Sequence, residues 1–164
     1  MMKRLLWIVL AVAAVRLTGL VPFESQDVAE LVPVQTLTVA VEDGRVVLNG
    51  GDCLGRGADW NAALADLEQS GNGVVFLGTA EQIVLSDNAM EILPDVIRCP
   101  RLRPAAVLCV CEGDPPEPEA VTDYLSAHDA VVTIQQVQAA MLAERGIALP
   151  RLVETEGGLR LDGA

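Results

Sequence analysis

Aromatic residues make up only 3% of this 164-residue chain. They are Trp7, Phe23, Trp60, Phe76 and Tyr124. A platform that stacks single-stranded nucleic-acid bases needs several exposed rings, so this scarcity argues against one. Basic residues are also few, at 11 against 23 acidic residues, and the formal net charge is −12. Such a surface repels phosphate backbones, and we therefore expect no nucleic-acid partner.

The familiar catalytic motifs are missing. The glycines at positions 50, 51, 55 and 57 lack the Lys-Ser/Thr or the third glycine of phosphate-binding loops, and a loop that leads from a hairpin to a helix explains them better. No Gly-x-Ser-x-Gly elbow occurs. His128 is the only histidine, and Ser126 and Asp129 lie beside it. Because a triad requires spatial geometry rather than adjacency, we expect a helix-end histidine and no enzyme; a hydrolase built on His128 is the third hypothesis.

Four cysteines leave three interpretations open. Cys109 and Cys111 share one face of a predicted strand and can be small core residues. A structural disulfide among Cys53, Cys99, Cys109 and Cys111 is the second, and its connectivity does not follow from the sequence. Metal or redox chemistry at Cys109 and Cys111 is the third, although zinc sites usually pair such a motif with another one. We expect no cofactor and no metal.

The amino terminus has the form of an export signal. Lys3 and Arg4 precede eleven consecutive apolar residues, from Leu5 to Val15. Spanning a bilayer takes about 20 residues, which this run reaches only if Arg16 snorkels to the interface. A buried helix of a soluble protein is the other interpretation. The positive start favours export, so we expect residues 1–22 to be a signal peptide or membrane anchor and residues 23–32 a linker, with the acidic bulk outside the cytoplasm.

The rest of the chain alternates strand and helix patterns, which predicts an α/β fold. The strong β patterns at 34–41 and 45–48 flank Asp43-Gly44, a hairpin signal. Further strands are predicted over 74–77, 81–85 and 105–111, and helices over 60–69, 88–98, 119–127 and 133–145. Asp59 and Thr133 are predicted helix caps, and Pro94 is expected to kink or split its helix.

We therefore expect a small, mixed β-sheet flanked by helices, preceded by an N-terminal apolar signal or anchor helix. Residues 33–130 would form the α/β domain, and 131–164 a C-terminal helix and a partly ordered tail rich in glycine. The acidic, proline-rich segment 112–119 lacks the ligand spacing of an EF-hand, so a solvated connection is expected there. Three arginines are candidate partner contacts, although pairing with neighbouring carboxylates explains them equally well. They are Arg98, Arg101 and Arg103.

Residues 75–85, Val-Phe-Leu-Gly-Thr-Ala-Glu-Gln-Ile-Val-Leu, resemble the amino-terminal domain of the C subunits of spore germinant receptors, the Ger(x)C family. Members carry a phenylalanine-rich strand ending in Gly-His, a second strand, a helix, a segment like Leu-Arg-Asp-Pro-Glu-Ile-Arg and an apolar strand closed by glycine. The counterparts here are residues 97–103 and 105–113. Leu17-Thr18-Gly19 is similar to the family's lipobox, and residues 27–32 to its linker and first strand. Residues 149–151 and 158–164 resemble its approach to a second domain.

The chain departs from that family at informative positions. Leu20 stands where the lipobox has its cysteine, so lipid cannot be attached there. The family's Gly-His is Gly78-Thr79, and the sequence stops where the family's second domain would begin, like a truncated copy. The resemblance implies a non-enzymatic, membrane-associated protein on the extracytoplasmic face of the cell membrane, or of the spore inner membrane. Its implied partners are the membrane, through the apolar segment, and the germinant receptor A and B subunits. The alternative is an extracytoplasmic small-ligand or metal-binding domain that uses Cys109 and Cys111.

Overall fold

A computed structural model describes residues 31–71, 73–128 and 132–163. The predicted signal peptide or anchor helix (1–22) and the first part of the linker lie outside these residues, as does the lipobox-like segment. The last residues assigned to the linker begin strand β1 (Leu31–Pro33). No helix in the described segments has both the length and the apolar character needed to cross a bilayer.

The predicted mixed α/β architecture is confirmed. A seven-stranded sheet has the strand order β4-β3-β2-β6-β7-β8-β9. Its members are β4 (Leu54–Gly57), β3 (Arg45–Asn49), β2 (Thr36–Glu42), β6 (Gln82–Ser86), β7 (Val107–Cys111), β8 (Arg151–Thr155) and β9 (Gly158–Asp162). β2, β6, β7 and β8 run parallel, whereas β3, β4 and β9 pair antiparallel with their neighbours.

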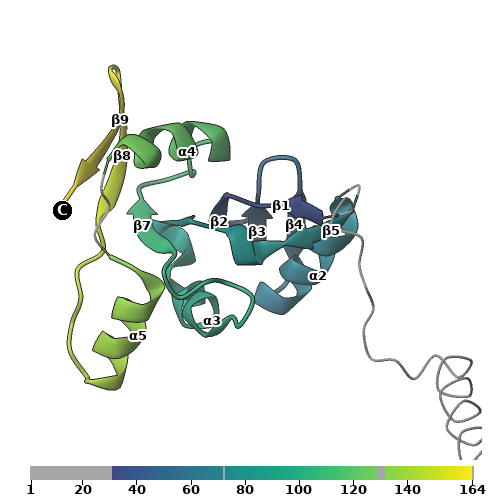
Figure 1. Cartoon of the computed structure of the whole chain (residues 1–164), viewed down its shortest axis with the longest axis horizontal. Coiled ribbons are helices and arrows are strands. Elements are labelled where there is room, and N and C mark those ends of the chain that lie inside the picture. Colours follow the sequence, from purple (N-terminus) through teal and green to yellow (C-terminus); the bar gives the residue numbers. More distant parts are fainter. Residues whose placement is uncertain (1–30, 72, 129–131, 164) are drawn as a thin grey trace, which may run out of the picture. The chain divides into compact units, whose positions relative to one another are not determined.

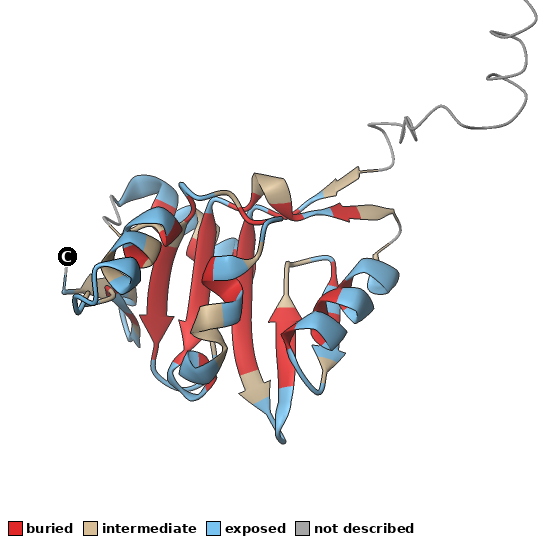
Figure 2. Cartoon of the chain, turned by 90° about the horizontal axis from the view of Figure 1, so that it is seen from below, coloured by how far each residue is buried: buried red, intermediate tan, exposed pale blue. Residues whose placement is uncertain are grey.

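Helices cover both faces of this sheet (Figure 1). α2 (Trp60–Ser70), α3 (Leu93–Arg98) and α5 (Ile134–Leu142) pack on one face over the larger apolar core, whereas α4 (Pro118–Ala127) covers the other. Buried residues run along the central strands and the helix sides that face them (Figure 2). Alternation along each strand divides the two cores. Ile83 and Leu85 face the first, and Val84 faces the second.

The locally encoded elements agree with the prediction. Asp43 and Gly44 have φ values of 48° and 73°, and β2 and β3 pair from Glu42 opposite Arg45. Positive φ at both central residues is what the tight hairpin turn requires. The Asp59 carboxylate accepts the Ala62 N–H at 2.8 Å to cap α2.

Two further helix signals act as expected. Thr133 and Gln136 form a capping box at the start of α5. Pro94 lies in the first turn of α3 and separates it from the preceding 3₁₀ helix η3 (Asp87–Ile92), as the expected break predicts.

The predicted buried strand at 74–77 differs from the structure. β5 (Val74–Phe76) pairs only with β1, in a separate two-stranded sheet. Within it Val75 is buried, while Phe76 is 45% exposed. Leu77 belongs to the 3₁₀ helix η2 (Leu77–Thr79). Apolar residues alone therefore did not indicate which sheet the strand joins.

Glycine-rich segments also differ from the prediction. Gly55 and Gly57 lie in strand β4 rather than in a flexible loop, because their missing side chains let α2 approach closely. The expected partly ordered tail contains the β8–β9 hairpin, which continues the main sheet. There Gly158, with φ 108°, follows the turn and pairs with Thr155. Residues from α5 onward thus join the same sheet and core as the preceding segment.

Candidate interaction site

The predicted contact arginines lie at the end of α3 and in the turn after it. Arg98 ends the helix, and the N–H of Cys99 donates to the carbonyl of Val96 at 3.2 Å. Leu102 is buried, and its N–H donates to the Cys99 carbonyl at 3.3 Å. The buried leucine and these hydrogen bonds hold the turn, so the arginine side chains project from a well-anchored backbone.

Two of the three arginines pair with carboxylates. Arg101 contacts Glu68 of α2, and Arg103 contacts Glu81 at 3.2 Å. Both pairs are solvent-exposed, so each contributes about 1 kcal/mol or less. Arg98 is exposed and has no carboxylate within 4.0 Å among the described residues. Its charge is therefore open to an outside group.

A cleft of about 430 Å³ opens beside Arg98, between α2 and the end of α3. Its lining residues are Trp60, Asn61, Leu64, Ala65, Glu68, Asp95, Arg98, Cys99, Pro100 and Arg101. One side of α2 supplies the first five of these. Glu68 and Asp95 balance the two arginines, which makes the cleft amphipathic and nearly neutral in a chain of net charge −12. Such a surface can seat an apolar side chain next to a carboxylate.

Sequence reasoning did not anticipate the α2 side of this cleft. Glu68 lies 33 residues before its partner Arg101, and no local pattern links them. Trp60 is buried at the edge of the cleft. The only signal was that Trp60 and Leu64 share a helical face, and core packing explained that equally well.

The cysteine pair lies in the second apolar core. Cys109 and Cys111 are buried beside Val84, Val121 and Leu152. Burial raises the pKa of Cys109 to about 12 and that of Cys111 to about 11. The thiols are therefore protonated at neutral pH, whereas a metal ligand must be a thiolate. The described residues contain no group of three or more side chains placed to hold a metal ion.

The other two cysteines lie apart from that pair. Cys53 is buried, and its pKa is raised by burial and by the Asp52 charge. Cys99 is half-buried at the cleft beside Arg98. All four cysteines are free thiols in this structure. Cys109 and Cys111 thus pack as small apolar residues of the second core.

His128 follows the last turn of α4 and is held by that helix. Its ring stacks on Tyr124, with centroids 4.1 Å apart, and Nδ1 lies 2.8 Å from the Tyr124 carbonyl oxygen. The neighbouring Ser126 hydroxyl donates to the Asp123 carbonyl at 3.0 Å. The serine is thus used within the helix and is not hydrogen-bonded to the imidazole.

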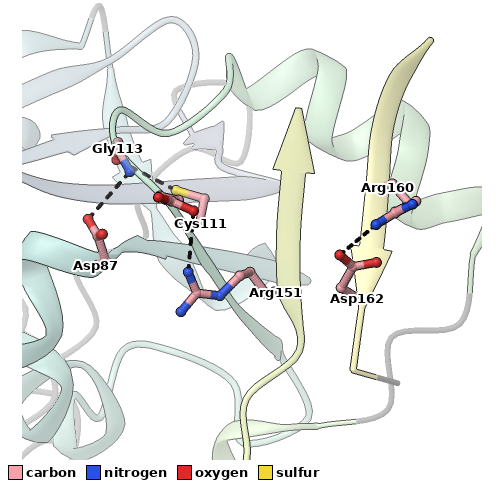
Figure 3. A network of polar contacts seen from close by, with 7 residues as sticks. Asp87, Cys111, Gly113, Arg151, Arg160 and Asp162 are labelled. Carbon is pink, nitrogen blue, oxygen red and sulfur yellow. Dashed lines mark hydrogen bonds and ion pairs between the residues drawn. The ribbon is translucent and has the colours of Figure 1, made fainter. Parts of the chain in front are cut away.

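The residues of the acidic segment after β7 contact different parts of the molecule (Figure 3). Gly113 N–H donates to Asp87 at 3.4 Å, and Glu112 lies 3.7 Å from Arg151. Asp114 and Glu117 line a groove of about 740 Å³ with α4 and the β8–β9 hairpin, whereas Glu119 lines a different cleft. The carboxylates do not converge on one point, in keeping with a solvated connection.

A buried polar chain joins β2, β6 and α4. The Thr36 hydroxyl lies 2.7 Å from the side-chain amide of Gln82 and 2.6 Å from the Thr122 hydroxyl. Thr122 in turn donates to the Pro118 carbonyl at 2.8 Å. These bonds satisfy polar groups inside the fold and fix the position of α4. Their role is structural, and its only trace in the sequence is Gln82 at the start of the apolar run 83–85.

Comparison with known proteins assigns this chain to no family. The chain matches no model of a protein family, no curated protein and no solved structure. The resemblance to the Ger(x)C family therefore stays a prediction, carried by the order of segments. In the fold these segments are β5, η2, β6, α3 and β7, which follow one another along the chain.

Proposed function

We propose that this protein is a non-enzymatic, membrane-associated, extracytoplasmic binding module. It would act in spore germination by protein–protein contact, like the first domain of a germinant receptor C subunit. The order of elements supports this, because the segments on which the resemblance depends follow one another through the sheet and α3. The partners that the resemblance implies are the A and B subunits, with the apolar amino-terminal segment holding the chain at the membrane.

One observation carries the proposal: Arg98 stands exposed beside an amphipathic cleft, with no carboxylate of the described chain within ion-pair distance. Arginine is enriched among the residues that dominate interface energies, because its fork binds carboxylates while its stem packs on apolar surface. A partner segment with an acidic residue next to an apolar one fits this cleft. Arg101 and Arg103 are already paired and would contribute less.

The test is receptor-dependent capture of the full chain, defined as capture by membranes that contain receptor A and B subunits minus capture by the same membranes without them. Arg98→Glu should weaken capture by about 10-fold or more, because it replaces attraction by repulsion at the contact. Arg45→Glu is the matched control, since Arg45 is also exposed and lies in the β2–β3 hairpin away from the cleft.

The control should bind like the unaltered chain. Equal capture of all three forms would exclude the α2–α3 cleft as the contact. Absence of capture by membranes with both subunits would exclude these partners.

A further inference from the structure

The two edges of the seven-stranded sheet differ in how far their outward backbone groups are hydrogen-bonded. At the β4 edge, α2 supplies acceptors for the outward backbone groups: Leu54 N–H donates to Ser70 Oγ at 3.1 Å and Arg56 N–H to Asp66 Oδ2 at 2.8 Å. These bonds close the edge to another strand. At the opposite side, no strand of the described chain lies beyond β9. An uncovered edge strand is a template for pairing with another chain.

The register of the hairpin shows which groups β9 presents. Thr155 faces Gly158 across a two-residue turn, and Leu152 faces Leu161. In an antiparallel pair, bonded and non-bonded positions alternate, so Leu159 and Leu161 direct their backbone groups away from β8. The Leu161 N–H confirms this direction, because it donates to the Tyr124 hydroxyl at 2.9 Å. A single side-chain hydroxyl is thus the only described group bonded to that N–H.

β9 lacks three of the usual protections of an edge strand against pairing. Its sequence, Gly158 to Asp162, contains no proline and no lysine, and its one-to-one register with β8 has no bulge. The side chains of Leu159 and Leu161 are half-buried against the second core. Arg160 and Asp162 lie on the opposite face and pair at 2.8 Å, both well exposed (Figure 3).

This edge is complementary in charge to itself. When two copies of β9 are placed antiparallel about a two-fold axis at Leu161, each Arg160 faces Asp162 of the other copy. Moving the axis to Arg160 sets two arginines opposite each other, and moving it to Asp162 sets two aspartates opposite each other. Like charges directly opposite destabilise a strand pair. The axis at Leu161 also aligns the outward backbone groups. An axis at Leu159, the other outward residue, would place Leu161 opposite Gly157 in the turn and lose the Arg160–Asp162 pairs, so the Leu161 register satisfies both charge and hydrogen bonding.

We propose that β9 is a self-association edge, to which a second copy of this chain adds antiparallel about Leu161. On association, Leu161 N–H exchanges the Tyr124 hydroxyl for the Leu161 carbonyl of the second copy. The two seven-stranded sheets then form one continuous sheet. The α2–α3 cleft lies under the opposite half of the sheet and stays open, so this proposal does not depend on the proposed function.

A charge-exchange experiment tests the register. The full chain in detergent micelles is examined by sedimentation velocity as wild type, Arg160→Asp, Asp162→Arg and an equimolar mixture of the two variants. In a dimer of either variant with itself, position 160 of each copy faces a like charge at position 162 of the other. The dissociation constant of that dimer should therefore rise by about 10-fold or more. In the mixture, every aspartate faces an arginine, so mixed dimers should form with wild-type affinity.

Recovery in the mixture also shows that both variants are folded. It separates β9 pairing from association through the apolar amino terminus, because the charge changes would not affect the latter. A monomeric wild type, variants that associate like wild type, or a mixture that does not recover would each overturn the proposal.

Tyr124→Phe tests the exchange of hydrogen bonds independently. Removing the hydroxyl leaves Leu161 N–H without its partner in the single copy, so pairing should tighten by about 2- to 10-fold, the value of one hydrogen bond. Weaker association of this variant would contradict the exchange.

Discussion

Cys109 and Cys111 behave as small apolar residues because of what lies against them. Both cysteines are buried in one apolar cluster with Val121 of α4 and Leu152 of β8. Burial removes water that would stabilise a thiolate, and the pKa values rise to about 12 and about 11. For Cys111, the negative charges of Asp87 and Asp114 add to this effect. The thiols therefore stay neutral at physiological pH.

This protonation makes stability depend on pH in a definite direction. Well below pH 9.0, the ordinary pKa of a thiol, both cysteines are neutral in the folded and unfolded states. As the pH rises through 9.0 the unfolded chain ionises first, because the folded pKa values are about 12 and about 11. The free energy of unfolding should therefore fall as pH rises through this range. Chemical denaturation at several alkaline pH values measures the fall, with the Cys109→Ala/Cys111→Ala variant as control. That variant should be less stable throughout but decline less steeply; parallel declines would contradict the assignment.

At single positions, the sequence defined candidates without deciding among them. The core interpretation of Cys109 and Cys111 is one of three, because the residues that bury them, Val121 and Leu152, lie in other elements and Leu152 is far along the chain. Arg98 and Arg101 are equivalent in the sequence, but in the fold Glu68 contacts only Arg101. Long-range contacts of this kind have no local signature, so residue type and spacing could not rank the alternatives.

Strand β4 and helix α2 pack backbone against backbone. A side-chain carbon on Gly55 would lie 2.3 Å from the Ala63 carbonyl oxygen, and one on Gly57 would lie 2.2 Å from the Ala63 nitrogen. No such contact is tolerated without displacement of the helix. Trp60 and Leu67 are buried by this packing, so its geometry positions the α2 wall of the cleft.

Gly57→Ala should therefore destabilise the protein. We expect a loss of about 2–3 kcal/mol, since the added carbon meets helix backbone that cannot rotate away. Gly146→Ala is the matched control, because nothing lies within 4 Å of its added carbon, and its effect should stay within about 0.5 kcal/mol. Urea unfolding measures both. Equal effects of the two substitutions would disprove the close approach of α2 to β4.

Elements with local signals were predictable, and those held by distant contacts were not. Asp43-Gly44, Asp59, Pro94 and Thr133 act through neighbouring backbone, and the hairpin, the caps and the helix break agree with the structure. Gly55 and Gly57 lie in β4 and serve a contact with α2, whereas the sequence predicts a loop there. Glu156 and Gly157 form the turn of the β8–β9 hairpin, and Gly158 follows it. This hairpin gains its stability from pairing with β7 and from Tyr124.

The two proposed contact surfaces occupy different ends of the sheet. α2 packs on β4 and β3 at one edge, and the cleft opens between α2 and the end of α3. β9 forms the other edge. A second copy at β9 and a membrane partner at the cleft can therefore bind together. With a net charge of −12, the chain gains little long-range attraction for acidic partners, so recognition depends on the short-range contact of Arg98.

Hydrogen exchange of the full chain, with and without membranes that hold receptor A and B subunits, tests binding at the cleft most directly. The account predicts slower exchange at residues 95–103, where α3 ends and the arginine turn begins, while the β2–β3 hairpin exchanges as before. Arg98→Glu should abolish the slowing. Unchanged exchange over residues 95–103 in the presence of both subunits would contradict the account.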